Sequence, residues 1–409
     1  MTPSAVPPAA CPTVPSDGPL PRLAIVLSHP IQYYSPWFQW LAAHTPLPFR
    51  VFYLWDFGVT TQRDPQFGRA IKWDIDLLSG YDCEFVPNVA RDPGTHHFHG
   101  LNNPALIERL AAWRPGAVLL FGYAWRSHLR ALLWARRRDL PVILRGDSHL
   151  LGRDAPTGLR RFALAALLRQ FSAFACVGGA NRDYYRALGI SASRLFFVPH
   201  SVNAARFDPD DPAARAAAAR WRETLGLGDR RVLLFAGKLQ ARKQPVELLH
   251  AFLAAAVPHS ALVFVGDGPL EGELKALAAA HPEATVRFLP FANQTEMPSR
   301  YLLADAFALP SRGAFETWGL AVNEAMHLGV PCLVSDVVGC HQDLVQPGRT
   351  GWIFPADDER ALTARLRELL GAPAAHLRAM GAAARQQAAG YTYAQTSAGL
   401  LRLLTQLPR

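Results

Sequence analysis

Cysteine is scarce in this sequence, and the few cysteines form no recognisable framework. They are Cys11, Cys83, Cys176, Cys332 and Cys340, and their spacing matches neither disulfide pairs nor metal ligands. Small disulfide-stabilised domains and zinc modules are therefore excluded as classes. Reduced thiols of this kind are typical of a cytoplasmic protein, and we expect that location.

Long apolar runs are also missing. No run reaches the roughly 18 residues that are needed to span a bilayer. Residues 1–20 are rich in Pro, Ala and Ser, and they contain no Lys, no Arg and no apolar core. A signal peptide would need these features, so we expect residues 1–20 to be a disordered tail.

Acidic residues are few in the first half of the chain. Lys and Arg outnumber Asp and Glu by 8 over residues 1–205, out of a net charge of +9 for the whole sequence. The excess is densest between Arg126 and Arg169, at Arg126, Arg130, Arg136, Arg137, Arg138, Arg153, Arg160, Arg161 and Arg169. Such a surface attracts anionic lipids or nucleic acids, or is simply well solvated. No basic–aromatic motif accompanies it. We therefore predict no nucleic-acid partner and, if the region binds a partner, an anionic membrane at the inner face of the plasma membrane.

The length and the apolar content indicate two domains. Half of the 409 residues are apolar, which is enough for two cores. Short apolar runs of the length of buried parallel strands recur along the chain. In the first half they fall at residues 23–27, 49–54, 83–86, 117–121, 141–144 and 174–177, with helical segments between them. This alternation predicts an α/β, Rossmann-like arrangement.

The segment 305–336 has the most specific pattern. An apolar strand at 306–309 is followed by the loop Pro310–Gly313, a helix that starts near Gly319, and a second strand at 332–334. Free amides at Gly319 and Leu320, at the start of that helix, suit a phosphate group. Glu316 precedes the helix and Glu324 lies within it, so the two carboxylates can bind sugar hydroxyls on either side of the phosphate. Ordinary helix acids, one in the first turn and one solvated, would give the same pattern.

The string PSRGAFETWGLAVNEAMHLGVPCLVSDVVGCHQDLVQPGRTGWIFP resembles the donor-site signature of the group 1 glycosyltransferases, the large retaining family 4. The pattern runs Pro-Ser, Glu, an aromatic residue with Gly-Leu, Glu-Ala, Gly-x-Pro, and Gly-x-Thr-Gly, and Cys332 stands where Val is usual. The opening SHPIQYYSP and the later WDIDLLSGY resemble a branch of this family that begins with His-Pro-Ile-Gln-Tyr.

Further segments of the second half resemble the same family. Residues 198–207 are similar to its interdomain segment, and the strand at 231–236 leads into a loop with Gly237, Lys238 and Lys243. In the family these cations bind the donor phosphates, whereas two exposed loop lysines would give the same string. Gly266 follows the next strand and allows a tight turn near a ligand. Residues 286–291 resemble the strand and loop whose backbone contacts the nucleotide base in relatives, and Phe291 ends this segment.

The first half departs from the common family pattern. The usual Gly-Gly loop after the first strand is replaced by His29–Gln32, and the usual histidine after the fifth strand is replaced by Arg145–His149. Asp147 and His149 are both candidates for the place of that histidine. Asp147 can equally serve as a cap of the following turn.

Two groups invite a metal interpretation. Asp74 and Asp76 form an Asp-x-Asp pair of the type that holds Mn²⁺ or Mg²⁺ in glycosyltransferases of another fold, but a lone pair is weak evidence. The histidines His96, His97 and His99 have no carboxylate or cysteine at ligand spacing in the sequence, so we expect a loop there rather than a metal site.

The resemblance implies a GT-B fold, with two Rossmann-like domains facing each other across a cleft. The implied units are a tail at 1–20, an acceptor-side domain at 21–205, a nucleotide-sugar-binding domain at 206–385, and a helix at 386–409 that crosses back. It implies transfer of a sugar from a nucleoside diphosphate sugar to a sugar or lipid-linked hydroxyl acceptor, with retention and without metal or cofactor, in surface polysaccharide or glycolipid synthesis. The implied catalytic residues are Glu316, Lys238, Lys243 and Asp147, and the implied donor-binding residues are Glu324, Gly237, Gly319, Leu320, Phe291 and Gly266. The alternatives are another GT-B enzyme, such as a nucleotide-sugar epimerase, and a non-catalytic sugar-binding protein.

Overall fold

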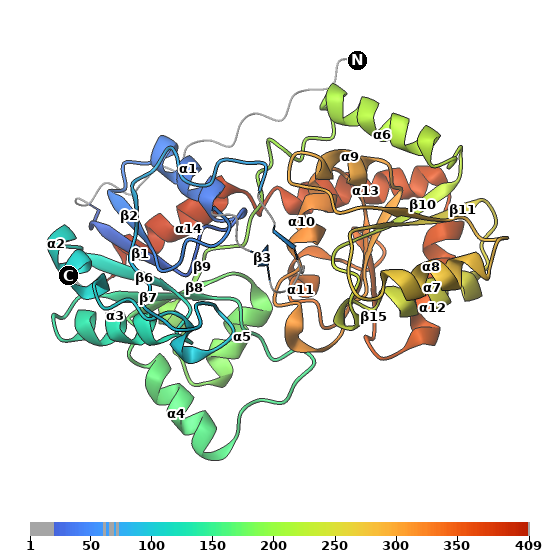
Figure 1. Cartoon of the computed structure of the whole chain (residues 1–409). Coiled ribbons are helices and arrows are strands. Elements are labelled where there is room, and N and C mark those ends of the chain that lie inside the picture. Colours follow the sequence, from blue (N-terminus) through green and yellow to red (C-terminus); the bar gives the residue numbers. More distant parts are fainter. Residues whose placement is uncertain (1–19, 60–62, 65–68, 71–72, 408–409) are drawn as a thin grey trace.

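The structure is a computed structural model that describes residues 20–407, apart from 60–62, 65–68 and 71–72. The predicted disordered tail, Leu20 excepted, lies outside the described residues. The chain forms two α/β units that lie side by side (Figure 1).

The first unit is built on a seven-stranded sheet in which every pairing is parallel. The strand order is β5-β2-β1-β6-β7-β8-β9. The strands are β1 (Leu23–Leu27), β2 (Phe49–Tyr53), β5 (Cys83–Phe85), β6 (Ala117–Phe121), β7 (Val142–Gly146), β8 (Ala173–Cys176) and β9 (Leu195–Phe197). The six strands predicted for this half are confirmed, whereas β9 was not predicted. Two short strands, β3 (Arg63–Asp64) and β4 (Arg69–Ala70), form a separate antiparallel pair.

Helices cover both faces of this sheet, which is why β1 and β6 are apolar at every position. The helices are α1 (Ser35–His44), α2 (Leu106–Trp113), α3 (Arg126–Arg136), α4 (Gly158–Leu168) and α5 (Gly179–Ala187). Two 3₁₀ turns accompany them, η1 (Phe98–Gly100) and η2 (Ala192–Arg194). One core contains Trp37 and Leu41 of α1, and the other contains Leu110 of α2 and Leu132 of α3.

The second unit is built on a six-stranded parallel sheet with the order β12-β11-β10-β13-β14-β15. Its strands are β10 (Arg231–Ala236), β11 (Ser260–Val265), β12 (Val286–Leu289), β13 (Ala306–Leu309), β14 (Cys332–Ser335) and β15 (Gly351–Phe354). Its helices are α6 (Pro212–Thr224), α7 (Pro245–Ala255), α8 (Glu271–Ala279), α9 (Met297–Leu302), α10 (Leu320–His327), α11 (His341–Leu344), α12 (Glu359–Gly371) and α13 (Ala374–Ala388). The 3₁₀ turns are η3 (Ala241–Lys243) and η4 (Gly313–Phe315). Two cores again enclose the sheet.

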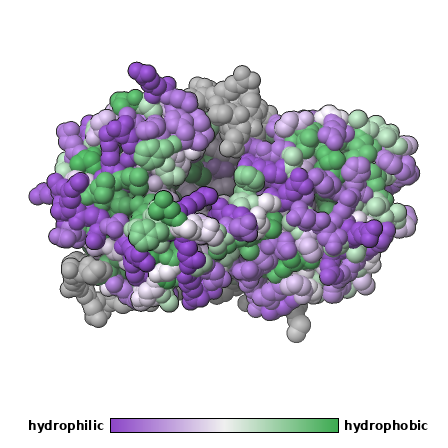
Figure 2. Space-filling view, turned by 90° about the horizontal axis from the view of Figure 1, so that it is seen from below, coloured by the Kyte–Doolittle hydropathy of each residue, from purple (hydrophilic) through white to green (hydrophobic). Residues whose placement is uncertain are grey.

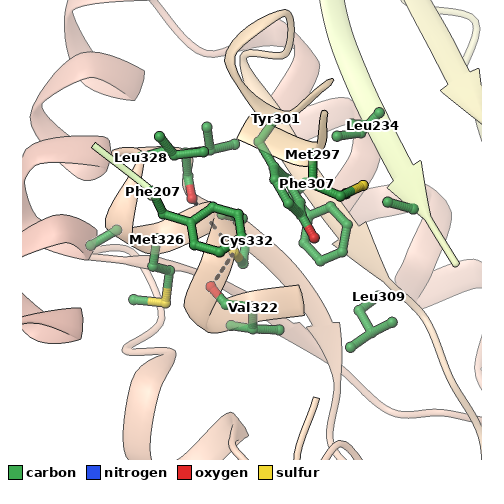
Figure 3. Packing of buried hydrophobic residues seen from close by; sticks show 14 of the residues in the cluster. Phe207, Leu234, Met297, Tyr301, Phe307, Leu309, Val322, Met326, Leu328 and Cys332 are labelled. Atoms are coloured by element: carbon green, nitrogen blue, oxygen red, sulfur yellow. Dashed lines mark hydrogen bonds between the residues drawn. The ribbon is translucent and has the colours of Figure 1, made fainter. Parts of the chain in front are cut away.

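The core under α10 fixes the helix that the sequence singles out. Figure 3 shows Val322 and Met326 of this helix among Phe307, Cys332 and Phe207. The thiol of Cys332 lies 4.0 Å from the carbonyl oxygen of Val322. Because all five side chains are buried, α10 is held rigidly against β13 and β14.

The last helix, α14 (Tyr393–Thr405), leaves the second unit and packs on the first (Figure 1). The indole of Trp37 donates a hydrogen bond of 3.0 Å to the hydroxyl of Ser397. Gly399 lies against the backbone of Phe197, since a Cβ atom at this glycine would be 2.2 Å from the Phe197 carbonyl oxygen. The C-terminal helix therefore joins the two units. None of the helices in the described part of the chain is both long and apolar enough to cross a membrane.

Candidate functional site

A cavity of about 560 Å³ lies between the two units and is lined by both. The first unit contributes the loop His29–Tyr34 after β1, together with Asp147 after β7 and His200. The second contributes loops that follow β10, β11, β12 and β13, and the start of α10. These loops leave the carboxyl ends of parallel strands, where open α/β sheets bind ligands.

All ten predicted site residues line this one cavity. They come from five separate strand ends, and they are Asp147, Gly237, Lys238, Lys243, Gly266, Phe291, Glu316, Gly319, Leu320 and Glu324. The structure therefore brings together what the sequence spreads over 178 residue numbers, from Asp147 to Glu324. The functional roles assigned to these residues stay predictions.

Lys243 and Glu316 form an ion pair inside the cavity. Their side chains are only 20% and 15% exposed, so the two charges are partly shielded from water. The hydroxyl of Ser311 donates a second hydrogen bond of 3.0 Å to Glu316. Glu316 is thus fixed in place at the point where the loop from β13 reaches α10.

The N-terminus of α10 opens into the cavity. Its N-cap residue, Gly319, has a left-handed backbone with φ of 98°, which is a region that favours glycine. A Cβ atom at this position would lie 2.9 Å from Val338 and 3.1 Å from Leu309. The glycine therefore allows both the turn and the close packing behind it, and the free amides that follow create a site for an anion.

Glu324 lies one turn further along α10 than Leu320, and its side chain is buried. Its carboxylate accepts a hydrogen bond of 2.7 Å from the hydroxyl of Tyr301. Burial raises the pKa of Glu324 to about 7, although the hydroxyls of Tyr301 and Tyr33 counteract part of this shift. The pKa of Tyr33 is in turn raised, first by burial and then by the charge of Glu324. Because Tyr33 belongs to the first unit, this cluster crosses the cleft.

Asp147 also connects the two units. Its carboxylate accepts a hydrogen bond of 2.7 Å from the hydroxyl of Thr317. His149, the other candidate for this place, is buried outside the cavity lining, and its Nδ1 accepts a hydrogen bond of 3.1 Å from the amide of Leu151. Of the two, only Asp147 faces the cavity.

Sequence reasoning missed several cavity residues. Tyr33 lies in the His-Pro-Ile-Gln-Tyr string that resembles a branch of the family, but the sequence predicted no role for it. His200 lies in the interdomain segment and contacts Tyr34 and Trp318, at ring-centroid distances of 5.9 and 5.5 Å. Burial lowers the pKa of His200 well below its usual value, so the ring is neutral. These contacts depend on how the units meet, and no local pattern reveals them.

The Asp-x-Asp pair serves two separate contacts. Asp74 accepts hydrogen bonds from the amide and the hydroxyl of Thr295, across the cleft. Asp76 accepts hydrogen bonds from the amide of Leu78, at 2.9 Å, and from Ser79. The two carboxylates therefore contact different segments of the chain.

The expectation that no carboxylate accompanies the histidines is wrong. One carboxylate oxygen of Asp92 lies 3.0 Å from Nε2 of His96 and 3.2 Å from Nε2 of His97. The ligand atoms of these three residues are close enough to hold a metal ion. Asp92 is four and five residues away in sequence, but the loop folds back. The cluster lies outside the cavity lining.

The arginine-rich region spans α3, the loop that follows β7, and α4. Several of its arginines bind protein groups: Arg130 donates to the side chain of Asn102 at 2.9 Å, and Arg161 donates to the carbonyl of Ala187 at 2.9 Å. Burial lowers the pKa of Arg194, and the nearby positive charge of Arg136 lowers it further. These contacts hold Arg130 and Arg161 in place. The exposed arginines of the predicted patch are Arg136, Arg137, Arg138, Arg153, Arg160, Arg161 and Arg169.

Comparison with known proteins agrees with this geometry. A family model described as glycosyl transferases group 1 matches residues 218–387. A GDP-mannose-dependent alpha-(1-6)-phosphatidylinositol monomannoside mannosyltransferase of Mycolicibacterium smegmatis is 36% identical over 315 residues, which cover 73% of this chain and 79% of the relative. A D-inositol 3-phosphate glycosyltransferase of Kineococcus radiotolerans is 30% identical over 365 residues, which cover 78% and 80%.

Solved structures show the same architecture. Anabaena Alr3699/HepE, in complex with UDP and glucose, has a TM-score of 0.68 at 15% identity and covers 95% of this chain and 100% of that one. Sucrose-phosphate synthase from Thermosynechococcus elongatus has a TM-score of 0.67 at 20% identity and covers 94% and 98%. At these identities the likeness concerns the fold, and the GT-B expectation of two Rossmann-like domains is confirmed. Together with the two curated relatives, the family match shows that this chain belongs to the group 1 glycosyltransferases.

Proposed function

We propose that this enzyme transfers a sugar from a nucleoside diphosphate sugar to a hydroxyl acceptor with retention of anomeric configuration, as in family 4. The observation that supports this most is the convergence of two lysines, a helix N-terminus and two glutamates in one cavity. An anion site flanked by hydroxyl-binding carboxylates matches the chemistry of a nucleotide sugar.

Each part of the donor has a place in this proposal. The diphosphate lies at the amides of Gly319 and Leu320, with Lys238 and Lys243 beside it. The ribose hydroxyls bind Glu324, and the base lies near Phe291 and the Gly266 turn. Glu316 and Asp147 position the transferring sugar and the acceptor. The acceptor thus enters from the first unit, opposite the donor.

The proposed reaction needs no side-chain nucleophile. Glu316 is paired with Lys243 and Asp147 with Thr317, so both carboxylates are committed to positioning. The bond between the anomeric carbon and the diphosphate oxygen breaks while the acceptor oxygen bonds to the same carbon on the same face. The acceptor proton passes to the departing phosphate oxygen. Lysine charge and helix amides stabilise the negative charge that grows on the diphosphate.

The same cations take the place of a divalent metal. We therefore expect activity to survive EDTA, because Lys238, Lys243 and the α10 terminus already neutralise the leaving group. The measurement is the initial transfer rate with and without excess EDTA. Complete loss that Mn²⁺ restores would contradict this prediction and would draw attention to Asp74 and Asp76.

The relatives suggest which substrates to test first. The Mycolicibacterium relative is named for GDP-mannose and a phosphatidylinositol mannoside. We therefore propose a role in glycolipid or surface polysaccharide synthesis at the cytoplasmic side of a membrane, with GDP-mannose as the first donor in a panel. Stereochemistry is read by NMR of the product linkage, and an inverted anomer would overturn the retaining mechanism.

Two alternatives are separated by the same assay. An epimerase would return an isomerised sugar or nucleotide sugar without using an acceptor. A non-catalytic sugar-binding protein would bind the nucleotide sugar and leave it intact. Release of free nucleoside diphosphate that depends on the acceptor supports the transferase over both.

A further inference from the structure

The N-terminal half of α4 exposes large apolar side chains. Leu159 is 82% exposed and Phe162 is 67% exposed. They are three residues apart and therefore lie on one face of the helix. The helix is anchored by its other end, where Ala165 and Leu168 are buried. Figure 1 shows α4 projecting from the lower edge of the first unit.

Positive charge surrounds these apolar side chains. Residues 150–163 contain Arg153, Arg160 and Arg161 but only one acid, Asp154. All four are exposed. Seen from below, the side on which α4 projects, the surface carries hydrophobic residues next to strongly hydrophilic ones (Figure 2). We call Leu159, Phe162, Arg153, Arg160 and Arg161 the α4 tip.

The α4 tip is connected to the rim of the cavity. Residues 147–157 form the single loop that leads from Asp147, in the cavity, to α4. Midway along this loop, Gly152 packs on the second unit, since a Cβ atom there would lie 3.1 Å from Val337 and 3.3 Å from Gly313. Phe315, two residues after Gly313, is 69% exposed, and the guanidinium of Arg242 lies 5.8 Å from its ring. The loop that leads into the α4 tip therefore packs on the second unit and begins at a residue that lines the cavity.

We propose that the α4 tip docks on a bilayer that contains anionic lipids and that the cavity thereby receives a lipid-carried acceptor, an assignment of acceptor that rests on the proposed function. Apolar side chains enter the boundary between head groups and acyl chains, while arginines remain at the anionic head groups. A second copy of this chain fits less well, because a self-contact would bring the same arginines against one another.

Vesicle binding by the full-length protein tests this proposal directly. Sedimentation with phosphatidylglycerol-containing vesicles is compared with sedimentation with pure phosphatidylcholine vesicles. We expect binding to the anionic vesicles only, and at least tenfold weaker binding for Leu159→Ser/Phe162→Ser, since each apolar side chain contributes to insertion. Arg160→Glu is expected to weaken binding most at low salt, where screening is least.

The controls make each outcome decisive. Leu133→Ser removes another exposed leucine, 52% exposed on α3, and is expected to bind vesicles like the wild type. Equal binding by the wild type and Leu159→Ser/Phe162→Ser would overturn the proposal. So would a wild-type dimer in light scattering that this variant converts to monomer, because the partner would then be a second copy.

Soluble assays separate this proposal from the proposed function. The tip variant should fold normally and should hydrolyse or bind the nucleotide sugar like the wild type, because Leu159 and Phe162 do not line the cavity. In the wild type, normal nucleotide-sugar turnover without vesicle binding would leave the function standing and refute the docking. Vesicle binding by a wild type that has no nucleotide-sugar activity would support the docking and refute the proposed function.

Discussion

Burial raises the pKa of Glu324 to about 7, well above the usual 4.5 of a glutamate. Below pH 4.5 the side chain is protonated in both the folded and the unfolded chain, and it costs nothing. Above pH 7 it is ionised in both, so the folded state carries the full penalty of a buried charge. The penalty therefore develops between pH 4.5 and pH 7. An acid retained under this penalty suggests a function for its charge.

Glu324→Gln removes the buried charge, so its effect on the free energy of unfolding should depend on pH. At pH 8 the variant should be more stable than the wild type by roughly 3 kcal/mol, because the rise of the pKa of Glu324 from 4.5 to about 7 costs about 1.36 kcal/mol for each unit and the variant removes it. At pH 4.5 the difference should vanish. Thermal unfolding at the two pH values measures it.

Donor binding should favour the ionised form of Glu324, although ionisation lowers the stability of the fold. If ionised Glu324 accepts the ribose hydroxyls, the donor KM of the wild type rises as the pH falls from 8 to 6, because protonation removes an acceptor. In Glu324→Gln the KM should be high and flat over this range, with kcat less affected. A pH dependence that persists in the variant would assign the titration to another group.

Lys238 and Lys243 are predicted to act on kcat. Each meets charge that grows as the glycosidic bond breaks, so replacement by Ala should lower kcat by about 10²–10³. Loss of Glu316 should also lower kcat, since misplacing the reacting sugar slows the chemical step. Because Lys243 and Glu316 contact each other, the double variant should lose less than the two single losses combined. Wild-type turnover in both lysine variants would show that the lysines only bind the donor.

The residues predicted for the site come together in the structure wherever they follow a strand. Lys238 follows β10 and Glu316 follows β13, and parallel strands bring their carboxyl ends to one edge. The contacts of Tyr33 and Asp147 with the opposite unit were not predictable in this way. They depend on the relative orientation of two domains, which no local spacing encodes. Asp92 was missed for a related reason, because a loop and not a helix brings it to His96.

At the scale of elements, the turn into α10 shows how backbone geometry creates the site. Gly319 has a positive φ and no room for a Cβ atom next to Val338. Gly348 also has a positive φ, of 75°, but no atom lies within 4 Å of a Cβ atom placed there. Alanine at Gly348 would therefore be strained but not crowded, whereas alanine at Gly319 would be both.

Gly319→Ala should cost about 1–3 kcal/mol of stability through strain, with crowding added, and it should displace the amides that bind the diphosphate. Nucleotide affinity should therefore fall more than tenfold. Gly348→Ala should cost only the strain and leave affinity unchanged. Chemical unfolding and calorimetric titration with a nucleoside diphosphate measure both. Equal affinity in the two variants would remove the α10 terminus from the site.

Most strands of both units were predictable from their apolar runs, because helices cover both faces of each sheet, but β15 was not predicted. Strand β9 was not, since Leu195 and Phe196 are half-buried and Phe197 is exposed. Its short run sits at the sheet edge and borders the interdomain segment. Edge strands carry a weaker apolar signal than central ones.

At the scale of the whole molecule, contacts from separate elements join the two units around the cavity. The carboxylate of Asp343 accepts a hydrogen bond of 2.9 Å from the amide of Gly179, at the N-terminus of α5. Asp147 and Asp74 make similar contacts with Thr317 and Thr295. A ligand in the cavity therefore touches both units, and its binding should stabilise the complete chain rather than one domain.

A panel of UDP, GDP and ADP tests this consequence and identifies the base. A nucleotide present at 100 times its Kd adds about 2.7 kcal/mol to stability. With a Tm shift of roughly 2–4 °C for each kcal/mol in a domain of this size, an increase of about 5–10 °C is expected. We expect GDP to give the largest shift, following the donor proposed above, and we expect EDTA not to reduce it. Lys238→Ala and Lys243→Ala should shrink the shift because the diphosphate loses its cations, whereas Leu133→Ser should not. A shift that is the same in the lysine variants would place the nucleotide elsewhere, and no shift with any nucleotide would contradict the donor site itself.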